Sequence, residues 1–289
     1  MNPTIADRRA AFRGLHQQGC FVLPNPWDPG SARLLEGLGF KALATTSSGH
    51  AWSLGQPDGA IARAQTLDHL RTMVEASALP LNADFESGFA DDPDGVAESV
   101  RMAVATGVAG LSIEDSTGDP ERPLRAPDEA VARIRAARAA IDASGGDTLL
   151  VGRAENFIVG RPDLADAVAR LKAYADAGAD CLYAPGIHTR EQITAVVAAV
   201  APKPVNLLIG SASEFSVADV AALGVRRISV GGALARAAWG GFLRAARGIA
   251  EDGRFDALAD GPTGAHLNAT FAAQTTTAAS QSRTGDDKR

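Results

Sequence analysis

The chain has 289 residues, of which 46% are hydrophobic, 21% charged and 5% aromatic, a composition typical of an ordinary globular protein. Its net charge of −6 argues against a nucleic-acid-binding protein, which would normally carry a basic patch. The first segment has no apolar signal core, and no run reaches the roughly 18 apolar residues of a membrane span, so we expect a cytoplasmic protein with no membrane contact. Cys20 and Cys181 lie in apolar runs and are interpreted as inert buried thiols.

Eight short apolar runs along the chain predict strands. They are apolar on both faces, as the buried strands of a parallel sheet usually are. The runs cover 20–24, 41–45, 79–84, 109–114, 148–153, 179–183, 204–208 and 227–230.

Amphipathic stretches of helical length alternate with these runs, at 31–38, 66–77, 94–106, 127–143, 163–177, 189–200 and 217–223. Several of them end in a glycine, the residue that closes a helix in the left-handed conformation. This alternation predicts an α/β fold, a (β/α)₈ barrel of the TIM type. A doubly wound sheet also alternates, but it usually has fewer strands, and no Gly-rich phosphate loop follows the first run.

The chain continues beyond the eighth run with the Ala- and Gly-rich segment 234–250 and with 254–271, which together exceed one closing helix. We therefore expect a barrel over 1–252, which includes a peripheral helix at about 233–250. A C-terminal helical extension is expected over 253–274. The polar segment 275–289 has the composition of a disordered tail.

Acidic residues gather where the predicted strands end, which is where the reactive residues of such a barrel lie. Asp84 and Glu86 end the third run, Glu114 ends the fourth, and Asp58 lies in the loop after the second. A single carboxylate of this kind commonly caps a helix or faces solvent, but three separate loops agree here. Carboxylate oxygens suit Mg²⁺, and no His or Cys cluster favours a softer metal.

Arg153 ends the fifth run, where a cation needs an anionic partner. It either pairs with Glu155 or Glu114, or it binds a substrate carboxylate through two parallel hydrogen bonds. Weaker candidates for the pocket wall are His50, after a Ser-Ser-Gly turn, and the polar residues that end the sixth and seventh runs, Tyr183 and Asn206.

Five segments, in this order and spacing, resemble the isocitrate lyase/phosphoenolpyruvate mutase superfamily over about residues 10–250. They read TTSSGHAWSLGQPD, LNADFESGF, GVAGLSIEDS, VGRAENFIVGR and LGVRRISVGGALARAA. The resemblance implies a barrel whose eighth helix, here 234–250, swaps to a neighbouring subunit and so gives a homodimer or homotetramer. It also implies a small anionic 2-oxo acid as the substrate.

The resemblance further implies residue roles. Asp84 would bind Mg²⁺, or Mn²⁺ in its place, directly, while the metal's waters would be held by Asp58, Glu86 and Glu114. The substrate carboxylate would be bound by Ser47, Ser48 and Gly49, with His50 and Asn206 as the weaker candidates above. The residues expected to take part in catalysis are Arg153, Glu114, Asp58 and Trp27, the last as a wall of the pocket.

The segment after the fourth run departs from the known branches of this superfamily. The lyase branch carries a K-[KR]-C-G-H loop, whereas this chain reads EDSTGDPERPLRAPDEA, with no Cys or His. The mutase branch carries E-D-K, whereas Ser116 stands at the Lys position here. The oxaloacetate decarboxylase branch also lacks the Cys and demands least of this loop, in which residues 117–120 resemble a gating segment.

These observations predict a Mg²⁺-dependent lyase that acts on a small 2-oxo or 2-hydroxy carboxylic acid through an enolate. The favoured reaction is carbon–carbon cleavage or decarboxylation of an oxaloacetate-like acid. One alternative is carbon–phosphorus chemistry of the phosphonopyruvate hydrolase or phosphoenolpyruvate mutase type. The other is a non-catalytic protein that binds 2-oxo acids.

Overall fold

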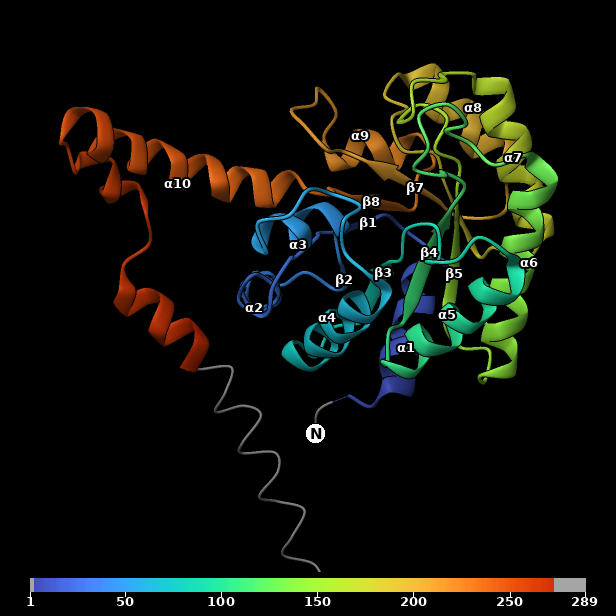
Figure 1. The fold of residues 1–289 in the computed structure, drawn as a ribbon, viewed down its shortest axis with the longest axis horizontal. Helices are drawn as coiled ribbons and strands as arrows, with labels where there is room; N and C mark the ends of the chain where they lie inside the picture. The colour runs from blue at the N-terminus through green and yellow to red at the C-terminus, as the bar shows by residue number, and fades with distance from the viewer. Residues whose placement is uncertain (1–2, 273–289) are drawn as a thin grey trace, which may run out of the picture.

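The computed structural model describes residues 3–272, and its centre is one sheet of eight parallel strands (Figure 1). The sheet order β1-β8-β7-β6-β5-β4-β3-β2 confirms the predicted TIM-type barrel. All eight predicted runs contain a strand. The strands are β1 (Phe21–Leu23), β2 (Leu43–Ala44), β3 (Leu81–Asp84), β4 (Gly110–Glu114), β5 (Leu149–Arg153), β6 (Cys181–Tyr183), β7 (Val205–Leu208) and β8 (Arg227–Ser229).

The barrel is nearly closed between its first and second strands, which share no ladder. The backbone N–H of Ala44 donates to the carbonyl of Pro24 at 3.0 Å across this seam. Beside it, the Asn25 amide donates to the carbonyl of Thr45 at 2.9 Å, and its Oδ1 accepts from the backbone of Val230, also at 2.9 Å. One buried side chain therefore joins the ends of three strands at the rim.

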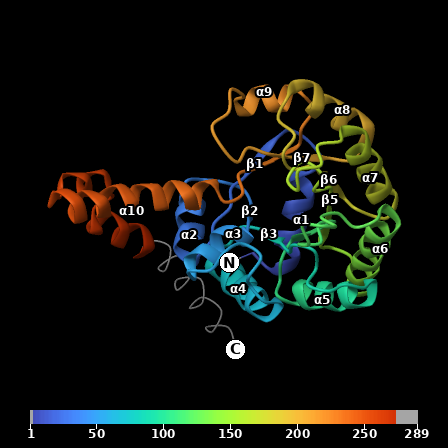
Figure 2. The ribbon, with the colours of Figure 1, turned by 45° about the horizontal axis from the view of Figure 1, so that its top comes forward.

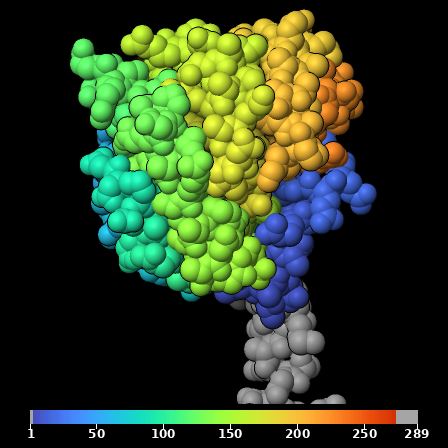
Figure 3. Space-filling view, turned by 90° about the vertical axis from the view of Figure 1, so that its right-hand side faces the viewer, coloured from blue at the N-terminus to red at the C-terminus, as the bar shows by residue number. Residues whose placement is uncertain are grey.

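Helices surround the strands, and α4 to α8 form an arc around them (Figure 2). Figure 3 shows the side of the barrel that α5 to α8 cover. The helices are α1 (Ile5–Leu15), α2 (Pro29–Gly37), α3 (Ser47–Ser53), α4 (Arg63–Ala76), α5 (Pro93–Ala105), α6 (Pro127–Ala143), α7 (Leu164–Asp176), α8 (Arg190–Val200), α9 (Val217–Ala222) and α10 (Ala233–Asp252).

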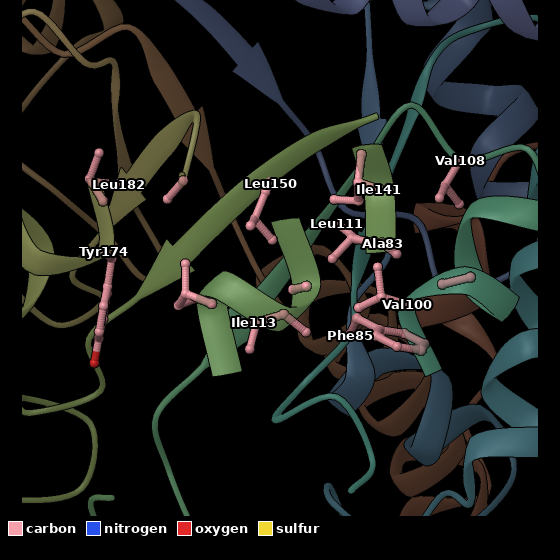
Figure 4. Packing of buried hydrophobic residues seen from close by; sticks show 14 of the residues in the cluster. Ala83, Phe85, Val100, Val108, Leu111, Ile113, Ile141, Leu150, Tyr174 and Leu182 are labelled. Atoms are coloured by element: carbon pink, nitrogen blue, oxygen red, sulfur yellow. The ribbon is translucent and has the colours of Figure 1, made fainter. Parts of the chain in front are cut away.

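Alternation along the strands separates an apolar outer face from an inner face that carries both polar and apolar residues. Ala83, Leu111 and Ile113 pack outward in the main hydrophobic cluster, together with Val100 of α5 (Figure 4). The strand positions between them line a cavity inside the barrel, as Asn82 and Ser112 do. The expectation of strands that are apolar on both faces is therefore wrong for the inner positions of β3 and β4, which lie next to a cavity, whereas Val151 of β5 and Cys181 of β6 keep their inner positions apolar.

Two helices were not foreseen from the sequence pattern. α1 begins at a capping box of Thr4 and Asp7 and places the fully buried Phe12 against the amino-terminal ends of the strands. α3 forms where a turn was expected, after Thr46, whose hydroxyl accepts from the backbone N–H of Gly49. The first helix closes the base of the barrel, and the second lies at the rim.

The chain beyond β8 begins with α10, which extends away from the barrel (Figure 1). It ends at Gly253 in the left-handed conformation. A 3₁₀ turn, η1 (Asp256–Asp260), follows, and residues 264–272 are helical. The predicted tail 275–289 lies outside the described residues. No helix within residues 3–272 combines the length and apolar character needed to cross a membrane.

Candidate active site

The acidic residues singled out from the sequence meet at the carboxyl end of the barrel. A cavity of about 720 Å³ is lined there by Asp58, Glu86 and Glu114, and the loop after β4 forms one of its walls. A narrower cavity of about 190 Å³ shares Asp58 and Arg153 with it and reaches down into the barrel. Asp84 lines this second cavity. We call the wider, acidic cavity the mouth of the site. The narrower cavity below it is lined mainly by polar side chains.

Arg153 occupies the centre of the acidic group. Its Nη1 donates to Asp84 Oδ1 at 2.7 Å and lies 3.1 Å from Glu114 Oε2, and its Nε donates to Glu155 Oε1 at 3.0 Å. The guanidinium also lies 5.0 Å from the centre of the Tyr183 ring. Burial disfavours the charged form, but the three carboxylates outweigh it and raise the pKa of Arg153, so this residue is a fixed cation. The pairing with Glu155 and Glu114 considered from the sequence is therefore present, and the binding of a substrate carboxylate stays a prediction.

Asp84 ends β3 with each carboxylate oxygen in contact with a protein donor. Oδ1 accepts from Arg153, and Oδ2 accepts from the backbone N–H of Ser47 at 3.0 Å. Its own backbone N–H donates to Thr45 Oγ1 at 2.8 Å, which fixes the end of the strand against β2. A carboxylate has about four lone-pair positions, so these bonds orient Asp84 and leave it able to bind a cation.

Glu86 and Glu114 are carboxyl groups whose ionised form the protein stabilises only in part. Burial, followed by the charges of Asp84, Glu114 and Asp58, raises the pKa of Glu86 to about 8. Burial also raises the pKa of Glu114 against the opposing effect of Arg153. Glu86 has a φ of 47°, an uncommon conformation for a residue other than glycine, and its carbonyl accepts from the backbone N–H of Glu114 at 3.0 Å.

Asp58 joins the cavity from the loop between α3 and α4. Burial is the main cause that raises the pKa of the Asp58 carboxyl, and the charge of Asp84 raises it further by a smaller amount. A hydrogen bond with Ser47 opposes the rise. Four carboxyl groups besides Glu155 therefore gather around the one guanidinium of Arg153. Such an excess of buried negative charge favours the binding of a cation.

Glu155 lines both cavities, although the sequence suggested it only as a partner of Arg153. It is buried, and its backbone N–H donates to Asp115 Oδ1 at 2.8 Å. Asp115 also accepts from the Tyr174 hydroxyl at 2.6 Å and from Arg170 at 3.1 Å. These contacts were missed because the residues come from the segments after β4 and β5 and from α7, and no local motif links them.

The residues expected to bind a substrate carboxylate lie in the first turn of α3. The N–H of Ser47 donates to Asp84, and the N–H of Gly49 donates to Thr46 Oγ1 at 3.3 Å. The Ser48 hydroxyl lies 3.1 Å from the same Thr46 oxygen, and Ser47 and Ser48 both line the inner cavity. Gly49 is buried instead, so its role here is close packing.

Three other candidates lie apart from the two cavities. Trp27 is in neither lining, and its Cβ packs beside Gly49. Asn206 is fully buried, with its amide bonded to Ser229 and to Arg227. His50 stacks on His69 with ring centres 3.6 Å apart, behind the acidic group.

The donor set fits a Mg²⁺ ion held largely through its own water molecules. Within residues 3–272, no three His, Cys, Asp or Glu side chains are placed to ligate one ion together. Mg²⁺ usually keeps several waters and takes one or two carboxylates directly, so one direct ligand with further carboxylates around it is sufficient. Asp84 suits the direct contact, and Asp58, Glu86 and Glu114 suit the contacts through water.

The loop after β4 is a hairpin that rises beside the acidic mouth. Ser116 pairs with Leu124 as an isolated antiparallel bridge, and the Thr117 N–H donates to the carbonyl of Pro123 at 3.0 Å. The Ser116 hydroxyl donates to Glu114 Oε1 at 2.6 Å. The residue at the mutase branch's Lys position therefore orients a carboxylate of the site.

Comparison with known proteins shows the family of the chain. Residues 12–250 match the family model described as phosphoenolpyruvate phosphomutase. An oxaloacetate decarboxylase from Paraburkholderia xenovorans is 34% identical over 238 residues, which span 79% of this chain and 76% of the relative.

Solved structures of similar proteins share the fold of this chain. A protein from Burkholderia cenocepacia J2315 described as a lyase/mutase is 50% identical, with a TM-score of 0.90, and the match covers 93% of this chain and 96% of that one. An oxaloacetate acetylhydrolase in complex with its product oxalate is 27% identical with a TM-score of 0.83, over 97% and 99% of the two chains. The chain therefore belongs to the phosphoenolpyruvate phosphomutase family, and it is an enzyme of the isocitrate lyase/phosphoenolpyruvate mutase superfamily.

Proposed function

We propose that this protein is a Mg²⁺-dependent carbon–carbon lyase that decarboxylates oxaloacetate or a closely related 2-oxo acid. The observation that carries the proposal is the convergence of four carboxylates and Arg153 beside a loop without Cys, His or Lys. The carbon–carbon lyases and the phosphomutases of this superfamily resemble each other in the metal site and differ in this loop. Support also comes from the oxaloacetate decarboxylases among the curated relatives.

The chain's own residues would bind and orient the substrate. Arg153 would contact a substrate carboxylate or the 2-oxo oxygen with its cationic edge, while Glu155 and Tyr183 hold the guanidinium in place. Ser47 and Ser48 would bind the same end of the substrate from α3. The hairpin 116–124 would cover the mouth and exclude water.

Decarboxylation needs little further chemistry from the protein. The bond between the leaving carboxylate and its neighbouring carbon breaks, CO₂ departs, and the electron pair stays on the 2-oxo fragment until a proton from solvent completes pyruvate. Mg²⁺ or Mn²⁺ bound by Asp84, and through water by Asp58, Glu86 and Glu114, would stabilise the negative charge that develops. No thiol or imidazole acid is required, which agrees with the composition of the loop.

A panel of substrates tests the reaction type. Purified protein with Mg²⁺ is given oxaloacetate, 2-methylisocitrate and phosphonopyruvate, and pyruvate and inorganic phosphate are measured against samples without enzyme. We expect pyruvate from oxaloacetate above the metal-catalysed background. Phosphate release from phosphonopyruvate would instead favour carbon–phosphorus chemistry, and binding of the panel without any turnover would favour a 2-oxo-acid-binding protein.

We further propose that α10 packs against a second copy of this chain, as the helix swap of the superfamily implies. Support comes from its apolar side chains, because Trp239, Phe242 and Leu243 are exposed at 39%, 60% and 43%. A row of this kind on a helix that leaves the barrel is typical of an interface. The assembly would be a homodimer or homotetramer.

A further inference from the structure

Arg227 is a buried cation at the start of β8 with only neutral partners. Its exposure is 2%, and its side chain points into the barrel below the acidic group. Nε donates to Asn206 Oδ1 at 2.8 Å and Nη1 donates to Asn82 Oδ1 at 3.2 Å, while the Phe12 ring centre lies 6.0 Å away. Within residues 3–272, no carboxylate lies within ion-pair distance of it, although Asp84 lines the same cavity.

A buried guanidinium with only neutral partners lowers the stability of the folded protein unless an anion binds to it. Removal of a guanidinium from water costs several kcal/mol, which a facing carboxylate normally offsets in part. Arg153 and Arg170 are compensated in this way by Asp84 and by Asp115. Arg227 receives two amide oxygens and an aromatic ring, which stabilise its position but do not neutralise its charge.

The free side of the guanidinium faces the inner cavity. Nη2 has no hydrogen-bond partner among the described residues, yet it is not among the atoms sealed within the protein. Arg227 lines the cavity of about 190 Å³ whose upper part contains Asp84 and Arg153. Ser112 and Ser229 add hydroxyl groups to its wall. The floor of the cavity therefore presents one unused donor group, Nη2 of Arg227, and a positive charge without an ion-pair partner, while both hydroxyls already have partners within the protein.

The distance between Asp84 and Arg227 along the strand direction suits a ligand with a carboxylate at each end. Arg227 bonds Asn82, and Asp84 lies two residues further along the same strand on the same side. Two strand residues span roughly 6.6 Å. A four-carbon dicarboxylic acid can reach from the Asp84–Arg153 level to Arg227, whereas a monocarboxylic acid of three carbons leaves the floor empty.

We propose that Arg227 binds the second carboxylate of a dicarboxylic 2-oxo or 2-hydroxy acid, and so selects dicarboxylates over monocarboxylates. The inference rests on the proposed function, since it extends the same cavity. The surroundings agree with it, because burial and the nearby charge of Arg153 lower the pKa of Arg227. An anion between the two guanidinium groups would offset the repulsion between them.

Calorimetry with two unreactive 2-hydroxy acids tests the proposal. Malate carries two carboxylates and lactate one, and each is titrated into the full chain with Mg²⁺. Wild type should bind malate about tenfold to a hundredfold more tightly than lactate, the range of one charge-assisted hydrogen-bonding group. Arg227→Gln should lose that preference and keep its lactate affinity within about twofold.

Two milder variants keep the test decisive if Arg227→Gln does not fold. Arg227→Lys should retain part of the preference for malate, and Ser229→Ala, on the same floor, should weaken malate binding more than lactate binding. Equal weakening of both acids, no change in either, or no preference in wild type would overturn the proposal. These results do not depend on turnover, so an absence of pyruvate from oxaloacetate would contradict the proposed function separately.

Discussion

At the scale of single residues, the site is organised around Arg153 and its three carboxylate partners. Each partner has a different second contact: Ser47 for Asp84, Ser116 for Glu114, and Asp115 for Glu155. Removal of one partner would leave its neighbours with an uncompensated charge. The orientation of Arg153 is therefore determined by the end of β5 together with the segments that follow β3 and β4.

A buried histidine far from the acidic group gives the protein a pH-dependent stability. Burial, and then the charge of Arg227, lowers the pKa of His16 from 6.5 to about 3. Between these pH values the unfolded chain binds a proton that the folded chain does not, so stability should be complete above about pH 6.5 and fall as the pH drops through this window. Urea unfolding between pH 7.5 and 4.5 would measure this slope.

The control for His16 is a histidine at the surface. His16→Gln should reduce the pH dependence between pH 6.5 and about 3, in the range where the chain still folds, and the remaining slope would come from His69, whose pKa burial also lowers to about 3. His266→Gln changes an exposed residue and should leave the slope as in wild type. Equal slopes for wild type and His16→Gln would show that His16 does not carry the effect.

At the scale of elements, α3 shows why local packing decides the shape of the rim. A Cβ on Gly49 would lie 2.7 Å from Thr46 Cγ2, 3.1 Å from Trp27 Cβ and 3.3 Å from Ala235 Cβ. The helix can therefore lie against the start of α10 only with glycine at this position. This contact places the N–H of Ser47 on Asp84.

Gly49→Ala should displace the first turn of α3. We expect a loss of about 1–3 kcal/mol in the free energy of unfolding, as for an overpacked core position, together with weaker binding of oxalate and Mg²⁺. Urea unfolding and calorimetry would measure the two effects. Gly14→Ala in α1 is the matched control, since nothing lies within 4 Å of its Cβ, and it should be neutral or slightly stabilising. Identical behaviour of the two variants would contradict the packing argument.

The elements that the sequence revealed are those with a strong local pattern. The eight strands and the helices between them follow from apolar runs, capping residues and glycines, and Asp84 and Glu114 follow from the strand ends. α3 was missed because a helix of seven residues has too little periodicity. The contacts of Asp115 and the isolation of Arg227 depend on residues distant in sequence, so only the folded chain reveals them.

At the scale of the whole molecule, the barrel and α10 differ in how they are stabilised. The barrel has a continuous core, whereas Ala235 is the one buried residue of α10 within this chain. The ring of Trp239 packs edge-on against that of Phe242 at 5.6 Å, which makes a local apolar patch with no cover from the described residues. A partner subunit would supply that cover.

Phe242→Glu should reduce the assembly to smaller species. A charge at a position exposed by 60% costs an isolated chain little, but it would be buried in the proposed interface. Size-exclusion chromatography with light scattering would measure the mass, and Arg135→Glu, exposed on α6, is the control that should not change it. A wild-type protein that is monomeric at all concentrations would contradict the proposed assembly.

The Mg²⁺ dependence of pyruvate formation from oxaloacetate, measured side by side for wild type and Asp84→Asn, tests the central claim most directly. The account predicts saturable, Mg²⁺-dependent turnover above the metal-catalysed background in wild type and its abolition by EDTA. Asp84→Asn should fold and lose at least about a hundredfold in rate, because the amide binds Mg²⁺ poorly. Turnover unaffected by EDTA, or an Asp84→Asn variant as active as wild type, would contradict the account.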